Sequence, residues 1–234
     1  MTAKEKEHLP GPSNSNTSKE VKEQIDKIYS GLLLPLDNIP WNQPEPPAAL
    51  VELIESGDVS PCKAIDLGCG TGNYAIYLAS QGFDVTGVDI SPKAIEIAKE
   101  NARKNVVRCN FIVADLLGDF GQIGETFDFA YDWELLHHIF PRQRTRYVEN
   151  VNRLLNPKAK YLSVCFSEKD RQFGGKGKYR KTRLGTCLYF SSEDEIKKLY
   201  SSYFNIFDLK TIEISGKLST HFVIYAFMEK IFLF

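Results

Sequence analysis

Short apolar runs alternate with stretches of helical spacing through the middle of the chain. The apolar runs cover residues 63–67, 84–88, 110–113, 127–133 and 161–166. Helices are expected between them, for example over 73–81 and 91–105, where Ser91-Pro92 is a typical helix start. Strands that alternate with helices form a parallel sheet buried on both faces. The pattern therefore predicts a doubly wound α/β fold.

The C-terminal part departs from this alternation. Residues 203–214 and 219–229 are two long β-rich runs, and the short segment SGKL joins them. Two such runs with a glycine-containing connection are typical of a hairpin. An antiparallel pair of strands is therefore expected to finish the sheet.

The N-terminal part is more polar and richer in proline. Residues 1–20 lack apolar periodicity and are predicted to be a disordered tail. Residues 21–34 have the spacing of an amphipathic helix. A proline-rich stretch around Trp41 follows, and a second helix is expected from Pro47 to Gly57.

Composition sets wide limits on function. Of the 234 residues, 43% are hydrophobic, and the formal net charge is −1, which gives no reason to expect a nucleic acid or a membrane as partner. The five cysteines are widely spaced and form no C-x-x-C pair, so neither a disulfide framework nor a metal site is expected. Without an apolar leader or a membrane-length segment, the sequence predicts a cytoplasmic protein.

The stretch DLGCGTG, residues 66–72, lies between the first apolar run and the first helix. A glycine-rich turn at this point is the usual ligand seat of a doubly wound sheet. Its G-x-G-x-G spacing differs from the dinucleotide fingerprint, because Asn73 stands where the third glycine would be. The lysine and hydroxyl of a P-loop are missing as well. The turn is therefore a poor match to a phosphate cradle.

Two carboxylates mark the ends of the next two apolar runs. Asp89 lies about 20 residues after Gly68, where a carboxylate can accept hydrogen bonds from both hydroxyls of a ribose. Asp115 ends the third run, within reach of an adenine amino group. The predicted ligand is an adenosine without phosphates.

The segments DLGCGTG, GVDIS, ADLL and FDFAYDWELLHHI together resemble the successive motifs of class I S-adenosylmethionine-dependent methyltransferases. The resemblance covers roughly residues 46–230 and implies S-adenosylmethionine as the cofactor. It also implies a Rossmann-like, mostly parallel seven-stranded sheet whose seventh strand lies antiparallel between the fifth and the sixth. The cofactor-binding methyltransferase domain would span residues 58–234, after a helical and proline-rich segment over residues 21–57.

The same resemblance assigns cofactor-binding positions. Asp66, Gly68 and Gly70 would surround the methionine part of the cofactor, and Asp115 with Leu116 would frame the adenine. The complete expected set is Trp41, Asp66, Gly68, Cys69, Gly70, Asp89, Ile90, Asp115, Leu116, Asp132 and Trp133.

Trp41 enters this set through a narrower likeness. The segment IPWNQPEPPAALVELIESG is similar to the Pro-Trp entry segment of the thiopurine, thiol and tellurite-resistance methyltransferases. That likeness implies a segment that folds over the cofactor. The alternative is an ordinary structural wrap, in which Trp41 is only a packing residue.

Candidate catalytic residues follow the fourth apolar run. Asp132 and Trp133 would face the sulfonium, and Asp132 either binds the substrate or holds the loop. His137 and His138 are candidate bases, because histidine is the natural base near neutral pH. The alternative is that these histidines only anchor the loop by hydrogen bonding.

A basic stretch, residues 167–183, carries seven Lys and Arg side chains against Glu168 and Asp170. It also contains three glycines, so it is expected to be mobile. One interpretation is a solvated loop. The other is a lid on the rim where substrates enter, which would favour an anionic substrate or an RNA backbone.

These observations lead to three hypotheses. The first is in-line methyl transfer to a small molecule, with a thiol or another soft nucleophile as the candidate acceptor. The second is an RNA or protein methyltransferase that uses residues 167–183. The third is a non-catalytic cofactor-binding subunit. The segment YDWELL lacks the Asn/Asp-Pro-Pro-Tyr motif of amino-group methyltransferases, which argues against nucleobase-amine substrates. The sequence leaves the oligomeric state open.

Overall fold

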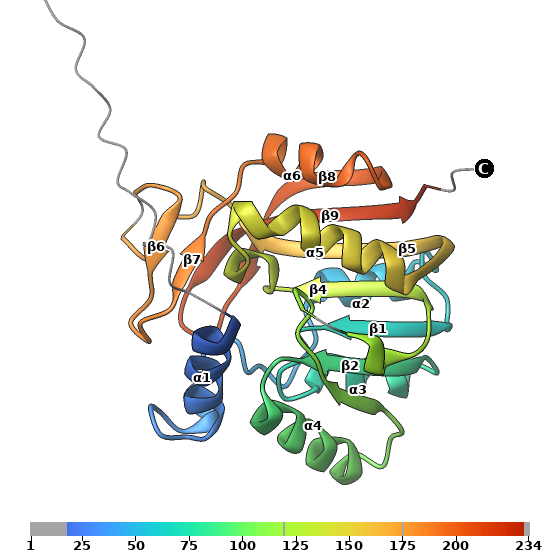
Figure 1. Cartoon of the computed structure of the whole chain (residues 1–234), viewed down its shortest axis with the longest axis horizontal. Helices are drawn as coiled ribbons and strands as arrows, with labels where there is room; N and C mark the ends of the chain where they lie inside the picture. Colours follow the sequence, from blue (N-terminus) through green and yellow to red (C-terminus); the bar gives the residue numbers. More distant parts are fainter. Residues whose placement is uncertain (1–17, 119, 175, 232–234) are drawn as a thin grey trace, which may run out of the picture.

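The apolar runs of the sequence form the centre of a seven-stranded sheet in the computed structural model, which describes residues 18–118, 120–174 and 176–231 (Figure 1). The strand order is β3-β2-β1-β4-β5-β9-β8. The strands are β1 (Lys63–Leu67), β2 (Asp84–Asp89), β3 (Asn110–Val113), β4 (Phe127–Trp133), β5 (Leu155–Phe166), β8 (Phe204–Ser215) and β9 (Thr220–Lys230). β9 runs antiparallel between β5 and β8, and the other neighbouring pairs are parallel. The predicted fold is thereby confirmed.

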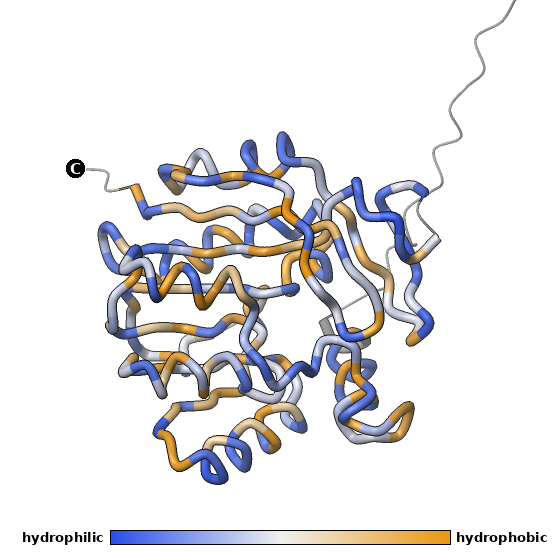
Figure 2. The backbone as a smooth tube through the Cα atoms, turned by 180° about the vertical axis from the view of Figure 1, so that it is seen from behind, coloured by the Kyte–Doolittle hydropathy of each residue, from blue (hydrophilic) through white to orange (hydrophobic). Residues whose placement is uncertain are grey.

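Helices cover both faces of this sheet. The helices are α1 (Ser18–Tyr29), α2 (Ala48–Glu55), α3 (Asn73–Ser80), α4 (Pro92–Lys104), α5 (Pro141–Leu154) and α6 (Glu193–Tyr200). Apolar side chains of α2, α3 and α4 pack in one buried cluster, and those of α5 and α6 pack in a second cluster on the opposite face. In Figure 2 the central strands are mainly hydrophobic, whereas α4, at the bottom, alternates between the two colours. Burial of apolar area on both faces stabilises the layered arrangement.

The N-terminal segment differs in detail from its prediction. Helix α1 begins at Ser18, inside the stretch assigned to the tail, and it ends at Tyr29 rather than near Leu34. Gly31 follows with a φ of 75°, a left-handed conformation that terminates helices. The expected tail at residues 1–17 lies outside the described residues.

The basic stretch is more ordered in structure than expected. Strands β6 (Tyr179–Lys181) and β7 (Cys187–Tyr189) form a separate antiparallel hairpin. In Figure 1 this hairpin and α1 both lie on the side where the arrows of β1 and β4 end. Ligands of doubly wound sheets bind at the carboxyl ends of the strands, so these two elements flank the expected site. None of the helices in the described ranges is long and apolar enough to span a bilayer.

Candidate active site

A cavity of about 1060 Å³ opens at the carboxyl ends of β1, β2 and β4. Four parts of the chain form its wall: the N-terminal segment, the glycine turn, the ends of the central strands, and the residues around β6, β7 and the β8–β9 turn. Of the expected cofactor-binding set, the residues that line it are Trp41, Asp66, Gly68, Cys69, Gly70, Asp89, Ile90, Asp115, Leu116 and Trp133. This volume lies just above the range of about 300–1,000 Å³ for small-molecule sites, so the cavity is large enough for a cofactor-sized ligand.

The glycine turn connects β1 to α3 through backbone conformations that residues with a side chain rarely adopt. Gly68, Gly70 and Gly72 have φ values of 79°, 51° and 79°. A Cβ atom on Gly68 would lie 2.9 Å from the side chain of Leu135, and one on Gly70 would lie 2.6 Å from the hydroxyl of Tyr29. The glycines therefore provide both the backbone shape and the close approach of neighbouring groups.

Asp66 presents an unpaired carboxylate oxygen to this turn. Its side chain is 3% exposed, and Oδ2 has no hydrogen-bond partner among the described residues. Burial, with a smaller contribution from the nearby Asp89, raises the pKa of this carboxyl to about 7, against the opposite effect of the neighbouring Tyr131 hydroxyl. A buried acceptor without a partner is costly, so this position fits a cationic group such as the ammonium of a bound amino acid.

Asp89 is tied to the turn by its own hydrogen bonds. Its Oδ2 accepts from the backbone N–H of Gly70 at 3.0 Å, and its Oδ1 accepts from that of Ser91 at 2.9 Å. Burial raises its pKa to about 6, although these backbone N–H groups act in the opposite direction. Each carboxylate oxygen keeps a further lone pair for a ligand hydroxyl, as the ribose assignment requires.

Asp115 and Leu116 lie after β3 on the same side of the sheet. Asp115 Oδ1 accepts a hydrogen bond of 2.9 Å from the backbone N–H of Leu117, which shapes the turn. Leu116 is buried and faces the cavity with this carboxylate. The pair supplies an apolar contact and a hydrogen-bond acceptor, the chemistry expected around an adenine.

Asp132 is a correction to the predicted set, because it does not line the cavity. Its side chain is fully buried on the opposite face of β4, where it accepts hydrogen bonds from Tyr147 (3.0 Å), Tyr161 and Ser163 (3.1 Å). Side chains alternate along a strand, so Trp133 faces the cavity and its neighbour points away. The structure gives Asp132 a buried polar network instead of contact with a sulfonium.

Glu134, which the sequence interpretation passed over, lies in the cavity wall directly after β4. Its φ is 65°, a strained value for this residue type, and its backbone N–H bonds to the carbonyl of Val164 at 2.9 Å. Burial raises the pKa of its carboxyl to about 7. The sequence could have indicated Glu134 as a site residue, because it directly follows the predicted fourth strand.

The two adjacent histidines have different surroundings. His137 is buried and stacks on Phe166 with ring centroids 4.3 Å apart, and its Nδ1 atom lacks a partner among the described residues. His138 lines the cavity together with His137, and its ring centroid lies 6.4 Å from that of Trp41. Burial lowers the pKa of His137 well below its usual value and that of His138 to about 4. Both rings are therefore neutral at pH 7, and a role as base stays a prediction.

The proline-rich segment is fastened to the glycine turn. Trp41 Nε1 donates a hydrogen bond of 2.9 Å to the hydroxyl of Tyr29. Asn42 Oδ1 accepts hydrogen bonds from Thr71 at 2.7 Å and from Asn73 at 3.1 Å. Tyr29 was also missed, because nothing in its own helix distinguishes it from a packing residue.

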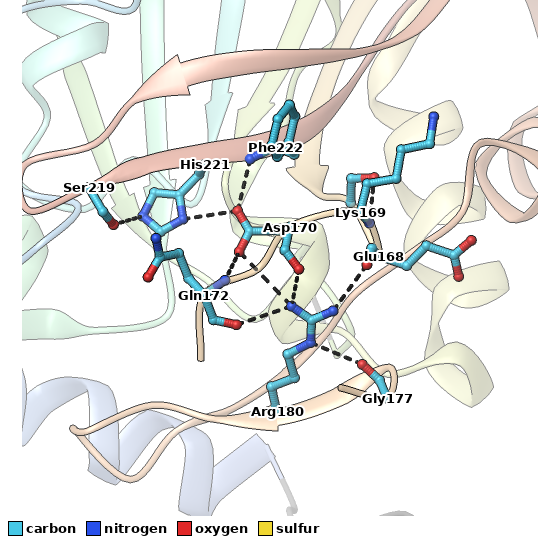
Figure 3. Close-up of polar contacts among 10 residues, drawn as sticks. Glu168, Lys169, Asp170, Gln172, Gly177, Arg180, Ser219, His221 and Phe222 are labelled. Carbon is cyan, nitrogen blue, oxygen red and sulfur yellow. Dashed lines mark hydrogen bonds and ion pairs between the residues drawn. The ribbon is translucent and has the colours of Figure 1, made fainter. Parts of the chain in front are cut away.

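The basic stretch contributes to the cavity in part. Arg171, Lys181 and Arg183 line it, as a lid would. Arg180 instead is 4% exposed, and its guanidinium donates to carbonyl oxygens of the surrounding loop (Figure 3). Arg180 is thus a buried structural group, which contradicts the solvated-loop interpretation for this side chain, and the mobility of the stretch stays a prediction. His221, from β9, lines the same cavity and is a further residue that sequence reasoning missed.

Comparison with known proteins agrees with this geometry. Residues 64–158 match the family model of a methyltransferase domain. A 2-heptyl-1-hydroxyquinolin-4(1H)-one methyltransferase from Mycobacteroides abscessus is 32% identical over 130 residues, which are 55% of this chain and 56% of the relative. A probable thiol methyltransferase 2 from Arabidopsis thaliana is 27% identical over 137 residues, 58% and 60% of the two chains. The chain thus matches little more than half the length of these curated relatives.

A solved structure extends the likeness to the whole fold. The 1,6-didemethyltoxoflavin-N1-methyltransferase of Burkholderia thailandensis, solved with bound S-adenosylhomocysteine, matches with a TM-score of 0.69 at 19% identity. The match covers 92% of this chain and 90% of that one. Fold and cavity together define a Rossmann-like cofactor-binding protein. The methyltransferase-domain match over residues 64–158 and this shared fold both agree with the predicted resemblance to the class I S-adenosylmethionine-dependent methyltransferases and with S-adenosylmethionine as the predicted cofactor.

Proposed function

We propose that the protein transfers a methyl group from S-adenosylmethionine to a small molecule, with a planar aromatic hydroxyl or a thiol as the acceptor. The observation that carries the proposal is the convergence of Asp66, Asp89 and Asp115 on one cavity that also has an aromatic wall. The relatives named above support this class of substrate, since one is named for a hydroxyquinolone and another for a thiol.

The cofactor end of the cavity is built from the strand-end carboxylates. We assign Asp66 to the ammonium of the methionine part, Asp89 to the ribose hydroxyls and Asp115 to the adenine amino group. Bound there, S-adenosylmethionine would supply an electrophilic methyl group on a positively charged sulfur. The protein's own contribution is to hold the two reactants in line and to exclude water.

The substrate end is lined by rings. His221 lies 5.1 Å from Phe166 between ring centroids, and Phe166 in turn stacks on His137. Phe173 stacks with His221 at 5.7 Å, with 9° between the ring planes. Flat side chains that share a wall favour a planar ligand.

Cations of the basic stretch complete the substrate end. Arg171, Lys181 and Arg183 line the cavity and form no ion pair with any described residue. Unpaired cations at a partly enclosed site attract anions and favour the ionised form of an acidic acceptor. An acceptor that carries an acidic hydroxyl or thiol is the kind of molecule these groups would retain.

The test is turnover of S-adenosylmethionine with a panel of 1-hydroxyquinolin-4-ones, aromatic thiols, aliphatic thiols and small amines. Methyl transfer would appear as S-adenosylhomocysteine and a methylated product by mass spectrometry. The Asp89→Ala variant is the control for background methylation, because it removes the ribose contact. A protein that binds the cofactor but methylates no member of the panel would contradict the proposal. Retention on RNA that weakens steeply with salt would instead favour the nucleic-acid hypothesis.

A further inference from the structure

His221 has a carboxylate partner, which distinguishes it from the two histidines after β4. Its Nδ1 atom lies 3.2 Å from Oδ2 of Asp170, and its Nε2 atom lies 3.2 Å from the hydroxyl of Ser219 (Figure 3). The ring lines the cavity. A histidine at a cavity wall, with one nitrogen on a buried carboxylate and the other on a hydroxyl that also lines the cavity, has the arrangement of a general base.

Asp170 is fixed by backbone groups as well as by the histidine. Its Oδ2 accepts from the backbone N–H of Phe222 at 2.8 Å, and its Oδ1 accepts from that of Gln172 at 2.7 Å. Burial acts to raise its pKa, but the hydrogen bonds from His221, Gln172 and Phe222 hold the pKa below its usual value. An ionised carboxylate only accepts hydrogen bonds, so Nδ1 of His221 carries the proton, and Nε2 of the neutral ring then accepts a hydrogen bond from the hydroxyl of Ser219, whose place the hydroxyl or thiol of the acceptor would take.

Arg180 holds the loop that carries this carboxylate. Its guanidinium donates hydrogen bonds to the carbonyl oxygens of Glu168 (3.1 Å), Asp170 (2.6 Å), Gln172 (3.1 Å) and Gly177 (3.0 Å). Its Nη1 is 4.0 Å from the carboxylate of Asp170, so it also balances that buried charge. The planar fork of an arginine suits several carbonyls at once, which a lysine cannot match.

The ring of His221 is also held by its neighbours in the cavity wall. Its ring contacts those of Phe166 and Phe173, at 5.1 and 5.7 Å between centroids, and these two rings also contact each other at 5.7 Å. The charged and titratable groups that act on it are Asp170 from its own side and Glu134 and His137 from the segment after β4. Glu134 belongs to the end of the strand that the methyltransferase resemblance places beside the sulfonium. Phe166 contacts both His137 of that segment and His221, so His221 lies on the same part of the cavity wall as the segment after β4.

We propose that His221, oriented by Asp170, is the general base that removes the proton from the acceptor, an inference that rests on the function proposed above. The O–H or S–H bond of the acceptor breaks, and its proton moves to Nε2 of His221. The electron pair of that bond stays on the acceptor atom, which then bonds to the methyl carbon. The imidazolium formed is stabilised by Asp170 and returns its proton to solvent after the product leaves.

Acceptors that differ in acidity test this role. Wild type, His221→Gln and Asp170→Asn are assayed with a 1-hydroxyquinolin-4-one, an aliphatic thiol and 4-nitrothiophenol, which is already ionised at neutral pH. His221→Gln is expected to lower kcat at least about a hundredfold for the protonated acceptors, with unchanged KM and unchanged cofactor affinity. It should change turnover of 4-nitrothiophenol less than about threefold, because no proton has to be removed. Lys104→Gln, at the exposed C-terminal end of α4 and outside the cavity wall, is the surface control.

The outcomes separate this proposal from the one on which it depends. A wild-type protein that methylates no acceptor overturns the proposed function, and the base with it. If the wild type is active and His221→Gln keeps the full rate, or loses rate equally on all acceptors, only the assignment of His221 as the base is overturned. The same holds if wild type and His221→Gln both methylate 4-nitrothiophenol and no other acceptor.

A measurement without turnover checks the geometry. Nitrogen NMR of the wild-type protein should show His221 protonated at Nδ1 and unprotonated at Nε2. The opposite tautomer would contradict the dyad. This measurement uses the wild-type protein, so it does not depend on whether the Asp170→Asn variant folds.

Discussion

The indole Nε1 of Trp41 donates a hydrogen bond of 2.9 Å to the hydroxyl of Tyr29, and that hydroxyl lies 2.6 Å from where a Cβ of Gly70 would be. A residue of α1 and a residue of the proline-rich segment therefore meet directly over the glycine turn. The N-terminal segment is thus part of the cavity wall at the predicted cofactor position. Its contribution to binding can be measured.

Tyr29→Phe should weaken cofactor binding. The change removes the acceptor of the Trp41 N–H and leaves a buried donor unpaired, at a cost of about 1–3 kcal/mol. Part of this cost appears as a lower free energy of unfolding and part as a roughly fivefold higher Kd, measured by thermal denaturation and calorimetry. Tyr203→Phe, which loses a surface hydrogen bond to Glu149, is the matched control. Equal Kd values for both variants and wild type would show that the contact between Trp41 and Tyr29 does not contribute to cofactor binding.

Asp89→Ala should lower cofactor affinity much more. Two charge-assisted hydrogen bonds to ribose hydroxyls are worth on the order of 2–4 kcal/mol, a factor of about thirty to a thousand in Kd. Calorimetry with S-adenosylhomocysteine measures this loss without a substrate. Asp84→Asn, at the other end of β2, should leave the affinity unchanged. An affinity of Asp89→Ala near that of wild type would refute the ribose assignment.

The central sheet was predictable because its strands are continuous apolar runs. The observed bounds of β1, β3 and β4 are those read from the sequence, and the C-terminal hairpin was expected from its two β-rich runs. The β6–β7 hairpin was not predicted. This hairpin carries Arg180, whose guanidinium is buried against carbonyl oxygens of the loop. Sequence composition alone would place such a charged side chain at the surface, because the contact forms only in the folded protein.

The site was predictable where it follows from the ends of parallel strands. Asp66 and Asp89 meet at the glycine turn for this reason. Asp132 was misplaced because only its nearness to the strand end was considered. The alternation of Tyr131 and Trp133 with it along β4 already indicated that it points to the other face. His221 was missed because only the fold brings it beside a loop about fifty residues earlier.

Asp132→Asn should reduce stability and spare cofactor binding. The carboxylate accepts hydrogen bonds from three hydroxyls, and an amide would direct its NH₂ group at donors. We expect a loss of about 1–3 kcal/mol in the free energy of unfolding by urea denaturation, with Kd for the cofactor within twofold of wild type. Asp128→Asn, at an exposed position of the same strand, is the control. A large rise in Kd without loss of stability would restore Asp132 to the cofactor site.

Arg180→Lys should loosen the loop of residues 168–177 without removing a charge. A lysine ammonium cannot reach the four carbonyl oxygens that the guanidinium contacts. Amide hydrogen exchange in this loop should accelerate at least about tenfold, whereas Lys181→Arg on the neighbouring position should leave it unchanged. If the two variants exchange alike, the guanidinium does not hold the loop.

Binding of S-adenosylmethionine should weaken as the pH falls below about 7, because Asp66 must be ionised to hold an ammonium. Burial and the nearby Asp89 raise the pKa of the free carboxyl to about 7, so it is largely protonated at pH 6. Binding of a cation favours the carboxylate and releases a proton, which costs affinity up to about tenfold per pH unit below the pKa. In the free protein the sign is opposite: a raised carboxyl pKa favours the folded state at low pH, and this contribution is lost as the pH rises through 7.

Calorimetry between pH 5.5 and 7, in two buffers of different ionisation enthalpy, measures both the change in Kd and the proton released. Asp66→Asn should bind weakly at pH 7 and lose the part of the pH dependence that Asp66 contributes, whereas Glu134, with a pKa of about 7 in the same cavity wall, and Asp89, with a pKa of about 6, still titrate. A wild-type Kd that is constant over this range, with no proton release, would mean that Asp66 does not face the ammonium. The unpaired oxygen of Asp66 would then need another ligand.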